Sequence, residues 1–338
     1  MSRSTDVPAL IEGIKSGNRA ALARAITLVE SRNPKHHALA RDLLRELTPL
    51  AGKSIRLGLS GVPGAGKSTF TDAMGCRLID QGHKVAVLAV DPSSSVSGGS
   101  VLGDRTRMGA LAQREEAFIR PSPTGLHLGG VARATREAML LVEAAGYDVV
   151  IVETVGVGQS EVAVAGMVDT YLVLMLSRSG DQLQGIKKGI LELADVIAVN
   201  KADGENEGEA RVTARDLSIA MKLVSSQANE RRVPVLTCSA LKQIGLDDVW
   251  QAVLDHRQYL DEKIGLERHR ANQQIDWMWA QTEAAILDSL HGAGPMRELS
   301  RSLIEQIERG QTNALDASTQ LLERFATLID SFEWTHSS

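Results

Sequence analysis

Hydrophobic and polar positions follow one pattern before residue 51, a second up to residue 260 and a third beyond it. In residues 6–50 the apolar side chains recur at helical spacing. Asn18 and Asn33, the second followed by Pro34, are residue types that begin helices. One helix face carries four leucines: Leu39, Leu43, Leu44 and Leu47. We expect residues 1–50 to form a helical extension whose apolar face packs against the next domain.

Residues 51–260 alternate short apolar runs with helix-compatible segments. Seven runs are expected to be strands: Ile55–Leu59, Val85–Val90, Ala117–Arg120, Val149–Glu153, Thr170–Leu176, Val196–Asn200 and Val233–Thr237. Several are continuously apolar, which is typical of strands covered on both faces. The alternation predicts an α/β fold with a doubly wound, mostly parallel, seven-stranded sheet flanked by helices. Ligands of such sheets bind beyond the carboxyl ends of the strands.

No strand is expected after residue 260. Six side chains recur at helical spacing: Ile275, Met278, Trp279, Thr282, Ile286 and Leu290. Two shorter helices are expected over 296–309 and 314–332. This face either packs as core against the main domain or is buried in a second copy of the chain. We favour the second interpretation, a helical dimerisation arm over residues 261–338.

Charge and composition narrow the function classes. The formal net charge of the 338 residues is −5, so electrostatics favour neither nucleic acid nor an anionic membrane as the main partner. No apolar run reaches the roughly 18 residues of a membrane span, and the first residues do not resemble a targeting signal. Only two cysteines occur, which fits a reducing compartment. We therefore expect a cytoplasmic protein.

A phosphate-binding loop follows the first predicted strand. The pattern G-x-x-x-x-G-K-[ST] is met by residues 61–68, with an apolar run before it and a helix-compatible run after it. Glycines allow backbone N–H groups to surround a phosphate, and the following helix start favours an anion. Lys67 is expected to reach the β- and γ-phosphates, and Ser68 to bind Mg²⁺. The expected nucleotide contacts are Gly61, Val62, Pro63, Gly64, Ala65, Gly66, Lys67, Ser68 and Thr69.

Three carboxylates are candidates for the magnesium site. Asp91 and Glu153 each end or follow an apolar strand, and Asp104 lies in a glycine-rich loop. P-loop proteins hold Mg²⁺ with an acid in such a place, directly or through water. The alternative for each is a turn or helix-cap carboxylate. Asp104 and Gln159 are also the candidates for positioning the attacking water, a choice that the sequence leaves open.

The tetrapeptide Asn200-Lys201-Ala202-Asp203 predicts guanine as the base. A carboxylate at Asp203 can accept from both the N1–H and the exocyclic amine of guanine, a pairing that adenine cannot supply. Lys201 would lie along the base. The next predicted strand end supplies three more expected contacts: Ser239, Ala240 and Leu241. We therefore expect GTP or GDP, with Mg²⁺, as the ligand.

Six segments together resemble the MeaB/ArgK family of P-loop GTPases, the methylmalonyl-CoA mutase-associated G proteins. They read GVPGAGKST, VDPSS, GGSVLGDRTRM, VIVETVGVGQSE, DQLQGIKKG and NKAD, and the resemblance covers nearly the whole chain. It implies a homodimeric GTPase that gates delivery of adenosylcobalamin to methylmalonyl-CoA mutase and protects or reactivates that enzyme. It also implies a switch loop, whose matching positions are Asp181, Gln184, Lys187 and Lys188. No D-x-H-x-x-G element occurs, so we expect the chain itself not to bind cobalamin.

The resemblance has one departure, and two other functions stay open. The family reads close to PGAGDELQ where this chain has Ser177-Arg178-Ser179-Gly180-Asp181-Gln182-Leu183-Gln184. Loss of a glycine there stiffens the loop, so coupling to a mutase can differ. One alternative is a protein kinase of a transport system, which the guanine motif disfavours. The other is a nickel metallochaperone, for which the sequence has no His-rich or CxxC tract.

Overall fold

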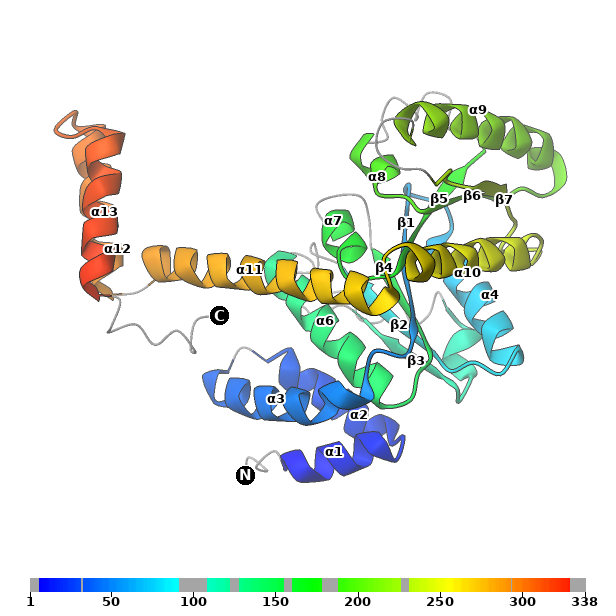
Figure 1. Ribbon diagram of the computed structural model, residues 1–338, viewed down its shortest axis with the longest axis horizontal. Coiled ribbons are helices and arrows are strands. Elements are labelled where there is room, and N and C mark those ends of the chain that lie inside the picture. Colours follow the sequence, from blue (N-terminus) through cyan, green and yellow to red (C-terminus); the bar gives the residue numbers. More distant parts are fainter. Residues whose placement is uncertain are drawn as a thin grey trace. The chain divides into compact units, whose positions relative to one another are not determined.

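A computed structural model describes residues 6–31, 33–90, 108–121, 128–154, 160–177, 188–225, 231–292 and 294–328. The chain forms two compact units, residues 1–270 and 271–338. The first unit contains the sheet and the N-terminal helices, and the second consists of helices (Figure 1).

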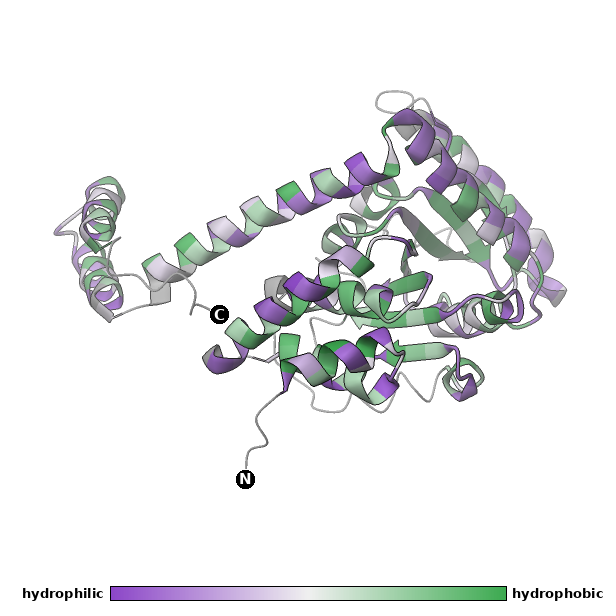
Figure 2. Cartoon of the chain, turned by 60° about the horizontal axis from the view of Figure 1, so that its bottom comes forward, coloured by the Kyte–Doolittle hydropathy of each residue, from purple (hydrophilic) through white to green (hydrophobic). Residues whose placement is uncertain are grey.

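A seven-stranded parallel sheet forms the centre of the first unit. Its order is β3-β2-β4-β1-β5-β6-β7. The strands are β1 (Ile55–Gly61), β2 (Val85–Val90), β3 (Ala117–Arg120), β4 (Val149–Thr154), β5 (Thr170–Leu176), β6 (Val196–Asn200) and β7 (Val235–Thr237). All neighbouring strands pair in parallel. Most of the length of the strands is hydrophobic, shown in green in Figure 2. The prediction of a doubly wound parallel sheet is thus confirmed.

Three strand ends differ from the prediction by one or two residues. β1 continues to Gly61 and β4 to Thr154, because both strands stay hydrogen-bonded to neighbours up to the carboxyl edge. β7 begins at Val235 rather than Val233. Pro234 has no N–H to donate, although its carbonyl accepts from the Ile197 N–H at 3.0 Å.

The direction of each crossover decides which face its helix covers. The connection from β1 to β2 runs toward the β3 edge of the sheet and contains α4 (Lys67–Asp80). The connections that run toward the β7 edge contain α6 (Leu128–Ala144), α7 (Ser160–Ala165), α8 (Lys188–Glu192) and α9 (Glu207–Ser225). Right-handed crossovers place these two groups on opposite faces. α10 (Leu246–Lys263) lies beside α4, and an ion pair between Arg77 of α4 and Asp247 of α10 joins the two helices. Short 3₁₀ turns occur at Thr48–Leu50, Leu111–Gln113 and Gly204–Asn206.

Three helices precede the sheet, as predicted. They are α1 (Val7–Lys15), α2 (Arg19–Val29) and α3 (Pro34–Leu47). Asn18 accepts hydrogen bonds from the N–H groups of Ala20 and Ala21, and Asn33 accepts one from Lys35. These are the caps that the sequence indicated. α2 and α3 pack on α6, and Leu43 and Leu47 are fully buried there.

α11 (Leu266–Gly292) begins in the first unit, and most of its length belongs to the second. The second unit also contains α12 (Gly294–Glu308) and α13 (Ala314–Leu328). α12 and α13 pack on each other around Met296, Leu303 and Phe325. In the single chain Ile275, Met278 and Trp279 are 51%, 52% and 58% exposed. No described helix is both long and apolar enough to span a bilayer.

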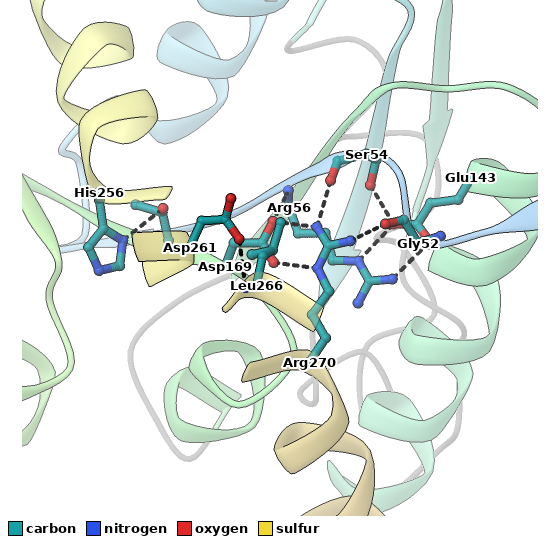
Figure 3. Close-up of polar contacts among 10 residues, drawn as sticks. Gly52, Ser54, Arg56, Glu143, Asp169, His256, Asp261, Leu266 and Arg270 are labelled. Carbon is teal, nitrogen blue, oxygen red and sulfur yellow. Dashed lines mark hydrogen bonds and ion pairs between the residues drawn. The ribbon is translucent and has the colours of Figure 1, made fainter. Parts of the chain in front are cut away.

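A buried charge network closes the amino edge of the sheet (Figure 3). The Arg56 guanidinium donates two hydrogen bonds to Glu143, at 2.7 and 2.8 Å. Glu143 also accepts from the Gly52 N–H and the Ser54 hydroxyl. Arg270, in the first turns of α11, donates to both oxygens of Asp169 at 2.8 and 2.6 Å. The network joins β1, α6, α11 and Asp169, which directly precedes β5, through side chains that are distant in sequence.

Acid should weaken this edge through Glu143. Burial alone would raise the pKa of Glu143, but the hydrogen bonds and charge of Arg56 outweigh it and hold the pKa below 4.5, its ordinary value. The stabilisation is therefore present above about pH 4.5 and is lost as the pH falls through the lower folded-state value. We expect the free energy of unfolding, measured by urea unfolding at several pH values, to fall less steeply below pH 4.5 in Glu143→Gln than in the parent. An acid slope unchanged in Glu143→Gln, and equal to that of the exposed control Glu12→Gln, would contradict this.

Candidate nucleotide-binding site

The loop between β1 and α4 has the backbone that a phosphate-binding loop requires. Gly64 and Gly66 have φ values of 77° and 84°, in the left-handed region that favours glycine. A Cβ on Gly66 would lie 3.0 Å from the Asn200 side-chain nitrogen. Gly66 precedes the first residue of α4, Lys67, so the loop leads directly into a helix N-terminus.

Lys67 lies across this loop. Its Nζ donates to the Gly61 carbonyl at 2.9 Å. Burial lowers the pKa of Lys67, and the carboxylates of Glu153 and Glu161 oppose that shift. The hydrogen bond holds the ammonium group against the loop that is expected to bind phosphate.

Glu153 and Ser68 meet, as expected for a magnesium site. Glu153 is buried near the end of β4, and its Oε1 accepts from the Ser68 hydroxyl at 3.1 Å. Its Oε2 accepts from the hydroxyl of Thr71 at 2.9 Å. A hydroxyl and a carboxylate are oxygen donors of the kind that Mg²⁺ prefers. Among the described residues, no group of three or more His, Cys, Asp or Glu side chains forms a metal site.

Asn200 joins the phosphate-binding loop to the base-binding segments. Its Nδ2 donates to the Ala65 carbonyl at 2.8 Å, and its Oδ1 accepts from the Ala240 N–H at 3.0 Å. The following residue, Lys201, has φ 61°, and the Ala202 N–H then bonds the Cys238 carbonyl at 3.0 Å. Asn200 therefore links the loop that is expected to bind phosphate with the segments that are expected to bind guanine.

Asp203 is oriented by Ser239. The Ser239 hydroxyl donates to Asp203 Oδ2 and accepts from the Lys242 N–H at 3.1 Å. This contact uses one of the two carboxylate oxygens of Asp203. Leu241, beside it, is 74% exposed and therefore available to a ligand. A carboxylate accepts hydrogen bonds, as the predicted contact of Asp203 with guanine requires.

Several predicted site residues lie outside the described residues. These are Asp91, Asp104, Gln159, Asp181, Gln184 and Lys187. Lys188 is the first residue of α8. The water-positioning and switch assignments therefore stay predictions, as do the magnesium and nucleotide contacts assigned to the described residues.

Thr71 was missed by the sequence interpretation. It lies three residues after Ser68, on the same face of α4, and is fully buried. That spacing is a signal that the sequence offered, but its partner Glu153 is 82 residues away. Only the pairing of β1 with β4 brings the two side chains together.

Comparison with known proteins identifies the family. A family model described as "Methylmalonyl Co-A mutase-associated GTPase MeaB" matches residues 22–294. The chain belongs to the MeaB family. A probable GTPase of Mycobacterium tuberculosis is 52% identical to it over 324 residues, covering 96% of each chain. The MeaB-family resemblance inferred from the motifs is thereby confirmed.

Other relatives carry names that bear on function. The Escherichia coli GTPase ArgK is 51% identical over 280 residues, covering 83% of this chain and 85% of its own. A mouse mitochondrial protein named methylmalonic aciduria type A homolog is 41% identical over 329 residues, covering 94% and 79%. The crystal structure of a LAO/AO transport system kinase matches with a TM-score of 0.77 and 40% identity, covering 96% and 99%. This MeaB-family chain therefore has a P-loop GTPase fold and relatives that are named GTPases.

Proposed function

We propose that this protein binds GTP with Mg²⁺ and hydrolyses it to GDP and phosphate. The observation that carries the proposal is Asn200, which ties the phosphate-binding loop to the segment of Asp203 and Ser239. The proposed nucleotide contacts are those of residues 61–69, 200, 201, 203 and 239–241. Ser68 and Glu153 would hold the metal, together with Asp91 and Asp104.

Hydrolysis needs charge neutralisation and a placed water more than covalent chemistry. Mg²⁺, when bound by Ser68 and Glu153, would supply positive charge to the phosphates. Lys67 and the loop N–H groups would supply the rest. Asp104 or Gln159 would orient the attacking water.

Lys67→Ala should lower GTP hydrolysis by about 10²- to 10³-fold, as loss of a preorganised donor to transition-state charge does. Phosphate release under single-turnover conditions measures it. Lys53→Ala is the control, because Lys53 is exposed just before β1, at the opposite edge of the sheet. Equal rates in Lys67→Ala and the parent would contradict the assigned role.

We further propose that the nucleotide state gates adenosylcobalamin delivery to methylmalonyl-CoA mutase and protects or reactivates that enzyme. The family description and the methylmalonic aciduria type A relatives support this role. Asp181, Gln184, Lys187 and Lys188 would form the switch loop that reports the nucleotide to the mutase. The chain itself would carry no cobalamin.

We also propose a cytoplasmic homodimer that binds neither nucleic acid nor membrane. The exposed apolar side chains at positions 275, 278 and 279 support dimerisation through residues 261–338. The net charge of −5 and the two cysteines support the remaining points.

The test of the mutase role is co-purification with a cobalamin-dependent mutase, compared between GDP and a non-hydrolysable GTP analogue. We expect complex formation that depends on the nucleotide. A chain that binds no mutase in either state would contradict the role and leave the GTPase proposal standing.

A transport-system kinase is the second candidate, because the solved structure with TM-score 0.77 carries that description. A kinase would move the γ-phosphate to protein, whereas a GTPase releases it to water. Incubation with γ-labelled GTP and ATP distinguishes the two. A metallochaperone role is disfavoured, because the sequence has no His-rich or CxxC tract that could hold a metal cargo.

A further inference from the structure

Thr71 makes a contact that its place in a helix does not require. Its hydroxyl lies 2.9 Å from Glu153 Oε2 and 3.1 Å from the Lys67 carbonyl, four residues earlier. A hydroxyl has one proton and so donates fully to one acceptor at a time. The carboxylate is the stronger acceptor because it is charged.

The two oxygens of Glu153 are held differently. Oε1 meets Ser68, the residue proposed to bind Mg²⁺, and Oε2 meets Thr71. If the Ser68 oxygen were to bind a metal ion, the Thr71 hydrogen bond would still restrain the Glu153 side chain. In known sites, removing a partner that orients a metal-binding carboxylate lowers the affinity of the site for the metal by about 10- to 100-fold.

We propose that Thr71 is a positioning residue that holds Glu153 toward the metal side of the phosphate-binding loop and so sets the Mg²⁺ affinity of the nucleotide complex. The proposal rests on the proposed nucleotide function. In this role Thr71 does not contact the nucleotide, and it acts only through Glu153.

A purely structural role makes a different prediction. A threonine that only bonds the carbonyl four residues earlier affects helix stability and nothing at the metal. Thr135 provides that case: it is buried in α6, and its hydroxyl donates to the Val131 carbonyl at 2.8 Å. Thr135→Val is therefore the matched control for Thr71→Val.

The experiment titrates Mg²⁺ into the full chain with a fluorescent GDP analogue, and also measures binding of that analogue in EDTA. We expect Thr71→Val to raise the half-saturating Mg²⁺ concentration by about tenfold, with binding in EDTA changed less than about twofold. Thr71→Ser should restore the parent value, and Thr135→Val should leave it unchanged. Thr71→Ala replaces the valine variant if that variant does not fold.

A double variant tests whether Thr71 acts through Glu153. In the Glu153→Gln background, Thr71→Val should have no further effect on the Mg²⁺ midpoint. A Thr71→Val midpoint equal to that of the parent, or equal effects of Thr71→Val and Thr135→Val, would overturn the role of Thr71 alone. A parent whose nucleotide binding does not respond to Mg²⁺ would overturn the magnesium part of the proposed function as well.

Discussion

Asp203→Asn should weaken GTP binding by about 10²- to 10³-fold and make xanthosine triphosphate the better ligand. Guanine presents two N–H donors to the carboxylate, whereas an amide offers one acceptor and places its own NH₂ against the exocyclic amine. Losing a hydrogen bond to a charged group and leaving a donor unpaired costs about 3 to 4 kcal/mol. Xanthine has a carbonyl in place of that amine and so accepts from the amide.

Calorimetry with GTP, xanthosine triphosphate and ATP in excess Mg²⁺ measures this change. Ser239 keeps a polar partner in the variant, so the side chain should stay oriented. Glu205→Gln is the matched control, because it removes a nearby exposed charge in the turn Gly204–Asn206. Unchanged GTP affinity in Asp203→Asn, or equal affinity of the parent for ATP, would contradict guanine recognition by Asp203.

Asp169→Ala should lower the free energy of unfolding by about 3 to 5 kcal/mol, a large part of the roughly 5–15 kcal/mol of a typical domain. The Asp169 side chain is fully buried and pairs with Arg270, which is also buried. The substitution leaves that guanidinium without its carboxylate. It also removes the acceptor of the Arg56 N–H, 3.0 Å away.

Urea unfolding of the first unit, followed by tryptophan fluorescence, measures the loss. The double variant Asp169→Ala/Arg270→Met should be more stable than Asp169→Ala alone, because it removes the buried charge as well. Asp247→Ala is the surface control, because it removes a solvent-accessible ion pair in which Arg77 donates two hydrogen bonds to Asp247. It should change the free energy of unfolding little. A similar loss in Asp169→Ala and Asp247→Ala would show that burial of the network contributes nothing.

The local parts of the site could be predicted because their chemistry lies in neighbouring residues. The glycines of residues 61–66, with Lys67 and Ser68, predict a phosphate-binding loop, and the structure has the left-handed glycines and the helix start that such a loop needs. The group from Asn200 to Asp203 predicts guanine through one carboxylate, which the calorimetry above tests. The helix starts at Asn18 and Asn33 are likewise read from single residue types and were found where expected.

The sequence by itself determined the elements and the loop between β1 and α4, and it predicted the base that the site selects, since each depends on residues within a few positions of one another. Only the tertiary structure decided the order β3-β2-β4-β1-β5-β6-β7 and the contacts that follow from it. Asn200 meets Ala65, Thr71 meets Glu153 and Arg270 meets Asp169 across 135, 82 and 101 residues. Such pairs depend on which strands lie side by side, and no local pattern of apolar and polar residues carries that information.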